Sequence, residues 1–88
     1  MLQKKVRIEN KLGLHARPAS LFVKTAGHYK SNVSLTKDGI EVNGKSIMGL
    51  LMLAVEGGSE VLVQVDGPDE EKAMEALIRL IEGKFDEE

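Results

Sequence analysis

The chain has 88 residues, no cysteine, two histidines and a formal net charge of −2 at pH 7. A chain of this length forms one domain, and its fold must rest on an apolar core because disulfides and cysteine-based zinc sites are excluded. Leu, Ile, Val and Phe number 26, enough for such a core. Little room remains to enclose a substrate, so a carrier, a regulator or a binding module is favoured over a self-sufficient enzyme.

Charge is distributed unevenly along the chain. Residues 1–48 carry nine basic and three acidic side chains, whereas residues 69–88 carry three basic and eight acidic ones. Such asymmetry is common on solvated surfaces, but it also provides a basic face for anions or acidic partners. The lack of cysteine, of a signal sequence and of a membrane-length apolar run predicts a cytoplasmic protein without membrane insertion.

The first half of the chain predicts a strand, a helix and a hairpin. Apolar and polar residues alternate over residues 5–9, which is typical of a half-buried strand. The pattern becomes helical over residues 16–26. Residues 32–36 and 40–42 alternate again on either side of an Asp-Gly pair, a strong tight-turn signal, so these two segments predict a β-hairpin.

The second half predicts a short helix, a central strand and a final helix. Ser46 is a good N-cap for an apolar helix over residues 47–53, and the apolar run over residues 61–65 predicts a buried strand. We expect Pro68 in the first turn of the last helix and Gly83 at its end. The residues expected to form its core-facing stripe are Ala73, Leu77, Leu80 and Ile81.

The element order is therefore β-α-β-β-α-β-α. Four amphipathic strands and three one-sided helices predict two layers, a sheet with helices on one face, and the hairpin favours antiparallel pairing. No linker or repeat interrupts the chain, so residues 1–88 are expected to form a single α+β domain.

One segment matches a nucleotide-binding motif. Residues 39–46 fit the phosphate-binding P-loop pattern letter for letter. However, the loop positions hold Ile40, Glu41 and Val42, which favour a strand, and a hairpin turn precedes them. The chain also lacks room for the nucleotide fold and for a later Mg²⁺-binding strand. The sequence therefore argues against a nucleotide site here.

A second segment, Gly13-Leu14-His15-Ala16-Arg17-Pro18-Ala19, places a histidine at or beside the N-cap of the first predicted helix. Unpaired backbone N–H groups and a partial positive charge make such a helix start an anion site. Arg17 adds a permanently charged donor set that suits phosphate oxygens, and a neutral imidazole at His15 would be a good nucleophile toward a phosphoryl group. On spacing alone, a surface histidine that merely caps the helix is an equally good interpretation.

Residues 13–19, together with Asn43-Gly44-Lys45-Ser46-Ile47-Met48-Gly49-Leu50, closely resemble the HPr family. Its members are the histidine-containing phosphocarriers of the bacterial phosphoenolpyruvate-dependent sugar phosphotransferase system. The resemblance runs from the first strand to the last helix, with both motifs at the family's spacing. It implies an open-faced β-sandwich with a four-stranded antiparallel sheet and three helices on one face.

The resemblance also implies roles for two residues. His15 would be phosphorylated on Nδ1 by phospho-enzyme I and would pass the phosphoryl group to sugar-specific enzyme IIA domains, while Arg17 would stabilise that group in transit. The protein would then be a carrier without independent turnover. The alternative is a nitrogen-branch or purely regulatory HPr paralogue, although His15 argues against regulatory relatives that carry glutamine there.

Ser46 is implied to be a regulatory site. The segment around Ser46 resembles that of relatives from low-GC Gram-positive bacteria, in which an ATP-dependent HPr kinase/phosphorylase modifies this serine. The modified form also binds a catabolite-control transcription factor. A phosphate at a helix N-terminus need not melt the helix, and its charge would repel acidic partners near His15. The alternative is that Ser46 acts only as an N-cap.

The apolar residues of the second predicted helix cannot all point inward. We expect Leu50 and Leu53 to be buried, whereas Ile47, Met48 and Leu51 would form a docking surface to which methionine adapts easily. Core packing is the simpler alternative. We expect no cofactor and no metal, and a monomer. Direct nucleic-acid binding is disfavoured because stacking aromatics are lacking and the net charge is negative.

Overall fold

The computed structural model describes residues 1–86, and these residues confirm the predicted element order. The elements are β1 (Leu2–Arg7), α1 (Ala16–Ala26), β2 (Asn32–Lys37), β3 (Ile40–Asn43), α2 (Ile47–Leu53), β4 (Glu60–Asp66) and α3 (Glu70–Glu82), followed by a short turn, Lys84–Asp86. None of the helices in the described part is long and apolar enough to cross a membrane.

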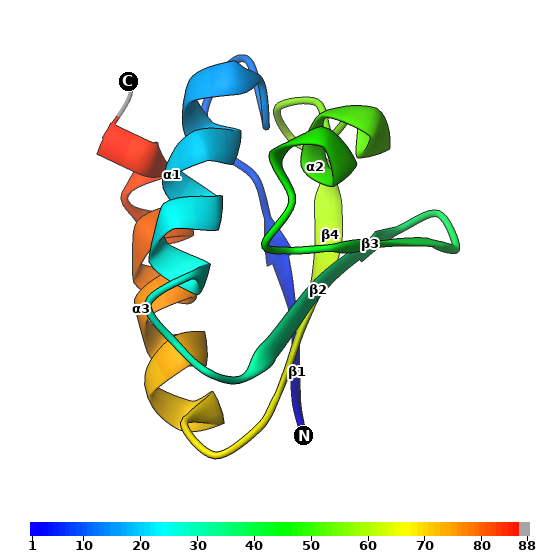
Figure 1. The fold of residues 1–88 in the computed structure, drawn as a ribbon. Coiled ribbons are helices and arrows are strands. Elements are labelled where there is room, and N and C mark those ends of the chain that lie inside the picture. The colour runs from blue at the N-terminus through cyan, green and yellow to red at the C-terminus, as the bar shows by residue number, and fades with distance from the viewer. Residues whose placement is uncertain (87–88) are drawn as a thin grey trace.

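The four strands form one open antiparallel sheet in the order β1-β4-β2-β3 (Figure 1). β4 is the last strand in the sequence but lies inside the sheet, hydrogen-bonded to both β1 and β2. Its alternate residues Val61, Val63 and Val65 are buried, as the apolar pattern of this segment predicted. The ladders run from Leu2↔Val65 to Arg7↔Glu60, from Asn32↔Asp66 to Thr36↔Leu62, and from Ser34↔Asn43 to Lys37↔Ile40.

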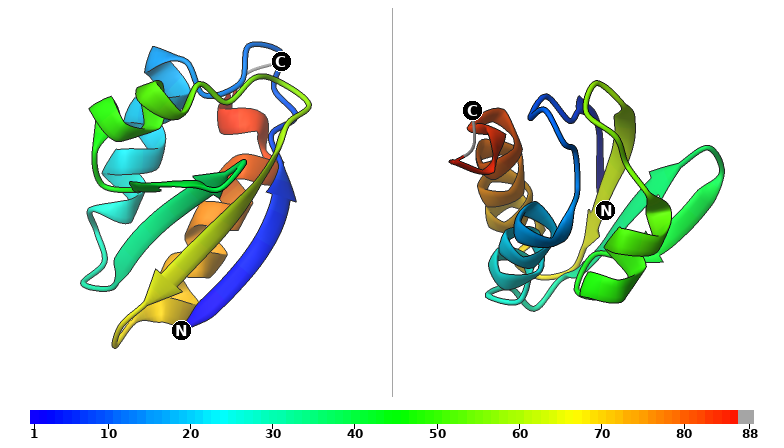
Figure 2. Two further views of the ribbon diagram at one scale, coloured as in Figure 1. Left: turned by 90° about the vertical axis from the view of Figure 1, so that its right-hand side faces the viewer. Right: turned by 90° about the horizontal axis from the view of Figure 1, so that it is seen from above.

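All three helices lie on one face of the sheet, which confirms the expected open-faced sandwich. α1 and α3 run side by side, and α2 packs next to α1 and β3 (Figure 2). The core fills the space between the two layers. Its fully buried members include Phe22 of α1, Leu50 of α2 and Leu77 of α3, which pack with the valines of β4. This burial is the main favourable term in the stability of so small a domain.

Strand β1 begins earlier than predicted. The sequence predicted residues 5–9 from their alternation of apolar and polar side chains, but the ladder with β4 starts at Leu2 and stops after Arg7. Ile8 has left the ladder while remaining fully buried, and its N–H donates to the carbonyl oxygen of Ser59 at 2.8 Å. The pairing partner, rather than the local pattern, therefore sets the strand boundaries.

The last helix also departs from the prediction. Pro68 does not lie in the first turn, because Asp69 is the N-cap and the helix begins at Glu70. Leu80 is only half-buried, whereas Met74 and Ile78 belong to the buried face. Phe85, for which the sequence predicted no element, is fully buried in the short turn after the helix.

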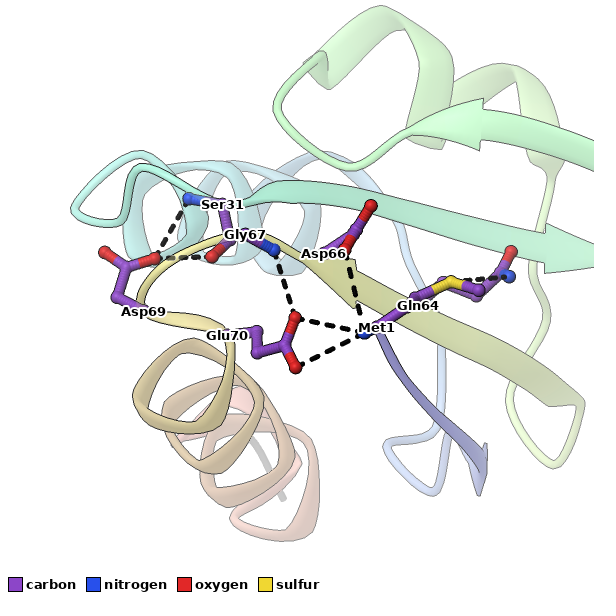
Figure 3. A network of polar contacts seen from close by, with 7 residues as sticks. All are labelled: Met1, Ser31, Gln64, Asp66, Gly67, Asp69 and Glu70. Atoms are coloured by element: carbon purple, nitrogen blue, oxygen red, sulfur yellow. Dashed lines mark hydrogen bonds and ion pairs between the residues drawn. The ribbon is translucent and has the colours of Figure 1, made fainter.

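Asp69 and Glu70 tie three strands to the start of α3 (Figure 3). The Asp69 carboxylate accepts hydrogen bonds from the Ser31 hydroxyl at 2.5 Å, the Ser31 N–H at 3.0 Å and the Lys30 N–H at 2.9 Å, just before β2. Glu70 accepts the Gly67 N–H at 3.1 Å after β4, and it pairs with the amino-terminal ammonium of Met1 at 3.3 Å. Because β1, β2 and β4 converge on this corner, α3 is fixed against the sheet at its first turn.

The same contacts change the acidity of both carboxyl groups. The bond from the Ser31 hydroxyl, followed by the bond from the Lys30 N–H, lowers the pKa of Asp69 from its ordinary value of 3.8 to about 2. The Gly67 N–H and then the Met1 ammonium lower the pKa of Glu70. Asp69 therefore contributes stability that is complete above about pH 4 and is lost as the pH falls through about 2.

We predict that Asp69→Asn lowers the free energy of unfolding at pH 7 and flattens its dependence on pH between 4 and 2. The physical reason is that the amide cannot lose a proton in this range and offers one acceptor oxygen instead of two. Urea titrations over this pH range measure both effects. Asp38→Asn, which removes an exposed carboxylate of the same charge from the turn between β2 and β3, is the control. An unchanged pH slope in Asp69→Asn would contradict the role assigned to Asp69.

Candidate functional site

His15 is the N-cap residue of α1, as the sequence predicted. Its backbone is extended, with φ −82° and ψ −169°, and its carbonyl oxygen accepts the Ala19 N–H at 3.0 Å, the first bond of the helix. The side chain is half-buried, whereas Arg17 is exposed two positions later. The imidazole thus lies at the helix start, within reach of solvent and of a second protein.

The start of α1 carries no compensating negative charge of its own. Its first turn contains no acidic residue, and neither does that of α2, whereas Glu70 and Glu71 occupy the first turn of α3. The partial positive charge at a helix N-terminus is therefore already balanced in α3 but not within α1, where Arg17 adds a further positive charge. This arrangement favours an anion at the beginning of α1.

Ser46 caps α2 as predicted. Its hydroxyl oxygen accepts the Gly49 N–H at 3.0 Å, and its backbone is extended, with φ −120° and ψ 115°. Its neighbour Lys45 is held by its ammonium group, which donates to the Tyr29 carbonyl oxygen at 2.7 Å. Residues 40–43 of the P-loop pattern lie in strand β3. They therefore have the strand conformation that argued against a nucleotide site.

Helix α2 has one buried and one exposed apolar face. Leu50 and Leu53 are buried, which confirms that part of the prediction. The exposed fractions are 41% for Ile47, 68% for Met48 and 40% for Leu51, so these three side chains are available on the surface. Because α2 packs against α1 (Figure 1), this face stands on the helix adjacent to the one that His15 begins.

The sequence analysis did not predict the exposed apolar side chains of Met52 and Leu12. Met52 is 76% exposed, one helical turn after Met48, and the helical period could have identified it. Leu12 is 67% exposed in the loop that leads to His15. No periodic pattern covers this loop, so its side-chain directions depend on tertiary contacts. We refer to Ile47, Met48, Leu51 and Met52 as the apolar face of α2.

Comparison with protein families gives one decisive match. The family model described as "PTS HPr component phosphorylation site" matches residues 2–83. The chain belongs to the HPr family. The match spans all four strands and three helices, which agrees with the HPr fold expected from the motifs around His15 and Ser46.

Individual HPr proteins are similar over their full length. The phosphocarrier protein HPr of Neisseria meningitidis is 52% identical over 87 residues, which cover 99% of this chain and 98% of that relative. The HPr-like protein Crh of Halalkalibacterium halodurans is 50% identical over 82 residues, which cover 93% and 98% of the two chains. The HPr relative and the Crh relative are therefore nearly equally similar to this chain in sequence.

Two solved structures of HPr from Thermoanaerobacter tengcongensis share the fold. HPr-C-His has a TM-score of 0.97 and 50% identity, covering 100% of this chain and 99% of that one. An HPr dimer has a TM-score of 0.78 and 49% identity, covering 97% and 98%. The fold of this HPr chain is thus well established by its relatives, whereas the expected monomer stays a prediction.

We predict that the two faces of α2 differ sharply in their effect on stability. Leu50→Ala should lower the free energy of unfolding by about 2–5 kcal/mol, because it opens a cavity in the core. Met52→Ala on the same helix should change it by less than about 0.5 kcal/mol, because the side chain is mostly solvated. Urea unfolding of both variants measures the difference. Similar losses in the two variants would contradict the assignment of the faces.

Proposed function

We propose that the whole chain, as a single HPr domain, is a phosphocarrier in the cytoplasmic part of the sugar phosphotransferase system. It accepts a phosphoryl group from phospho-enzyme I on Nδ1 of His15 and passes it to enzyme IIA domains. The observation that carries this proposal is the place of His15, at the N-cap of a helix whose first turn holds Arg17 and no carboxylate. Membership of the HPr family supports it.

The transfer is a displacement at phosphorus. The neutral His15 imidazole attacks the phosphoryl group of the donor, a new N–P bond forms, and the bond between phosphorus and the donor nitrogen breaks. Nδ1 must therefore be unprotonated before attack, while Nε2 keeps its proton. The second transfer repeats these steps with the acceptor of enzyme IIA as nucleophile. HPr returns unchanged and has no turnover of its own.

Positioning and charge supply most of the catalysis in such a step. Negative charge on the phosphoryl oxygens is balanced by the start of α1 and by the Arg17 guanidinium, which presents several N–H donors in one plane. Because Arg17 is exposed, it can follow the phosphoryl group between two partners. The apolar face of α2 provides the docking surface, and its two methionines adapt to partners of different shape.

Incubation with phosphoenolpyruvate and enzyme I tests the carrier function. The chain should acquire an acid-labile phosphate that is absent in His15→Ala and retained in His28→Ala, which removes the other, exposed histidine. Enzyme IIA should then discharge the label. Failure of the unsubstituted chain to become labelled would rule out the proposal.

Arg17→Ala should slow phosphoryl transfer by about 10²-fold, because it removes a donor to the transferring group. Its free energy of unfolding should change by less than about 0.5 kcal/mol, since the side chain is exposed. Lys24→Ala, which removes another exposed cation from the last turn of α1, should leave the rate unchanged. Rapid-quench kinetics and urea unfolding provide the two measurements. Equal effects of the two variants on the rate would contradict the role of Arg17.

We further propose that Ser46 is phosphorylated by an HPr kinase/phosphorylase, and that the modified form acts in carbon catabolite control through a transcription factor. The Ser46 oxygen would attack the γ-phosphorus of ATP and lose its proton, and ADP would leave. The product would place a dianion at the start of α2, where no acidic residue of the first turn opposes it.

Ser46→Ala tests this second site. The kinase and ATP should give an acid-stable phosphate that is absent in Ser46→Ala and present in Ser20→Ala, which removes an exposed serine from α1. Ser46→Ala should also lower the free energy of unfolding by about 1 kcal/mol, because the cap of α2 is lost. If the kinase leaves the unsubstituted chain unmodified, the regulatory proposal fails.

A purely regulatory role is the second candidate function. It is favoured by the 50% identity to the HPr-like protein Crh over 82 residues. The two candidates differ in one result. A regulator would be modified by the kinase at Ser46 but would not exchange phosphate with enzyme I, whereas a carrier is labelled at His15.

A further inference from the structure

The loop that leads to His15 rests on a second loop, which connects α2 to β4. The Leu14 N–H donates to the Val55 carbonyl oxygen at 2.9 Å, and the Ile8 N–H donates to that of Ser59 at 2.8 Å. These bonds continue the β1–β4 pairing beyond its last partners, Arg7 and Glu60. The two loops lie together at one end of the molecule (Figures 1 and 2).

The first of these loops contains a closed turn from Asn10 to Gly13. The Gly13 N–H donates to the Asn10 carbonyl oxygen at 3.1 Å, and the Asn10 side-chain amide donates back to the Gly13 carbonyl oxygen at 2.7 Å. Asn10 is fully buried, and Leu14 is 3% exposed. The turn is therefore bonded at both ends, and only the buried Leu14 separates it from His15.

The contact between the two loops leaves no room for a side chain at two glycines. A Cβ atom on Gly13 would collide with the Val55 carbonyl oxygen and would lie 2.7 Å from the carbonyl carbon of Glu56. A Cβ atom on Gly57 would collide with the Lys11 carbonyl oxygen and would lie 2.5 Å from that of Asn10. All of these are backbone atoms, so a substitution must move the turn itself.

We infer that Gly57 is a positioning residue for phosphoryl transfer at His15. Because Gly57 has no side chain, the turn over residues 10–13 can pack closely against its backbone. This close packing places the His15 imidazole at the start of α1. Unlike Gly13, Gly57 does not have a positive φ, so alanine is compatible with its backbone and the contact alone excludes it. This inference rests on the proposed function of His15.

Gly57→Ala tests the inference, with Gly58→Ala as the matched control. Gly58 has a φ of +89°, but a Cβ atom there meets nothing within 4 Å, so the control strains the same loop without pushing on the turn. In Gly57→Ala the kcat of transfer from phospho-enzyme I should fall by about 10²-fold, as expected for a misplaced reacting group. The KM should not change, because the apolar face of α2 stays in place.

Two further readouts separate positioning from a loss of stability. Rates are expressed per folded molecule, from the thermal unfolding curve of each variant. In addition, the NMR chemical shifts of the His15 ring should change in Gly57→Ala and remain unchanged in Gly58→Ala. Equal effects of the two substitutions on kcat or on these signals would overturn the inference.

Failure of the inference about Gly57 can be distinguished from failure of the proposed function. If the unsubstituted chain is not labelled by enzyme I, the proposed function fails, and the ring signals still decide whether Gly57 positions His15. If Gly57→Ala does not fold, hydrogen exchange of the unsubstituted chain decides. A Leu14 amide as protected as those of β4 supports the inference, whereas exchange at the rate of an open loop overturns it.

Discussion

The insertion of β4 between β1 and β2 is the constraint on which the rest of the structure depends. The sheet is incomplete without β4, because β1 and β2 do not pair with one another and are joined through β4. Val61, Val63 and Val65 supply the centre of the core against which the helices pack. The same pairing brings the loop before α1 against the loop before β4. The position of His15 thus depends on β4, the last strand in the sequence.

The starts of the helices serve two different purposes in this molecule. At α3, Asp69 and Glu70 neutralise the helix end and bind the backbone beside the neighbouring strands, so charge is used there for structure. At α1 and α2 the first turn contains no acidic residue, and the N-caps are His15 and Ser46. Both caps are nucleophilic side chains at ends that favour negative charge. An added phosphate therefore meets a favourable field at either position.

The small size of the domain explains how its surface is used. Helix α2 has seven residues and is held by Leu50 and Leu53, while its other face is left to the solvent. An isolated helix of this length is unstable in water, so its tertiary contacts must hold it in place. An apolar surface on a well-anchored helix, next to the half-buried His15, suits the proposed carrier function, in which several partners would have to reach His15.

The sequence by itself determined the order of the elements, the hairpin, the N-caps His15 and Ser46 and the two faces of α2. These features follow from local periodicity and from caps and turns, which act over a few residues. Family membership was also visible in the motifs around His15 and Ser46. What the tertiary structure decided involves residues far apart in the chain. The strand order, the start of β1, the burial of Phe85 and the bonds from Ser31 to Asp69 depend on long-range partners. The constraint at Gly57 is of this kind, because the atoms that exclude a side chain there come from the loop before α1, and no local pattern encodes that contact.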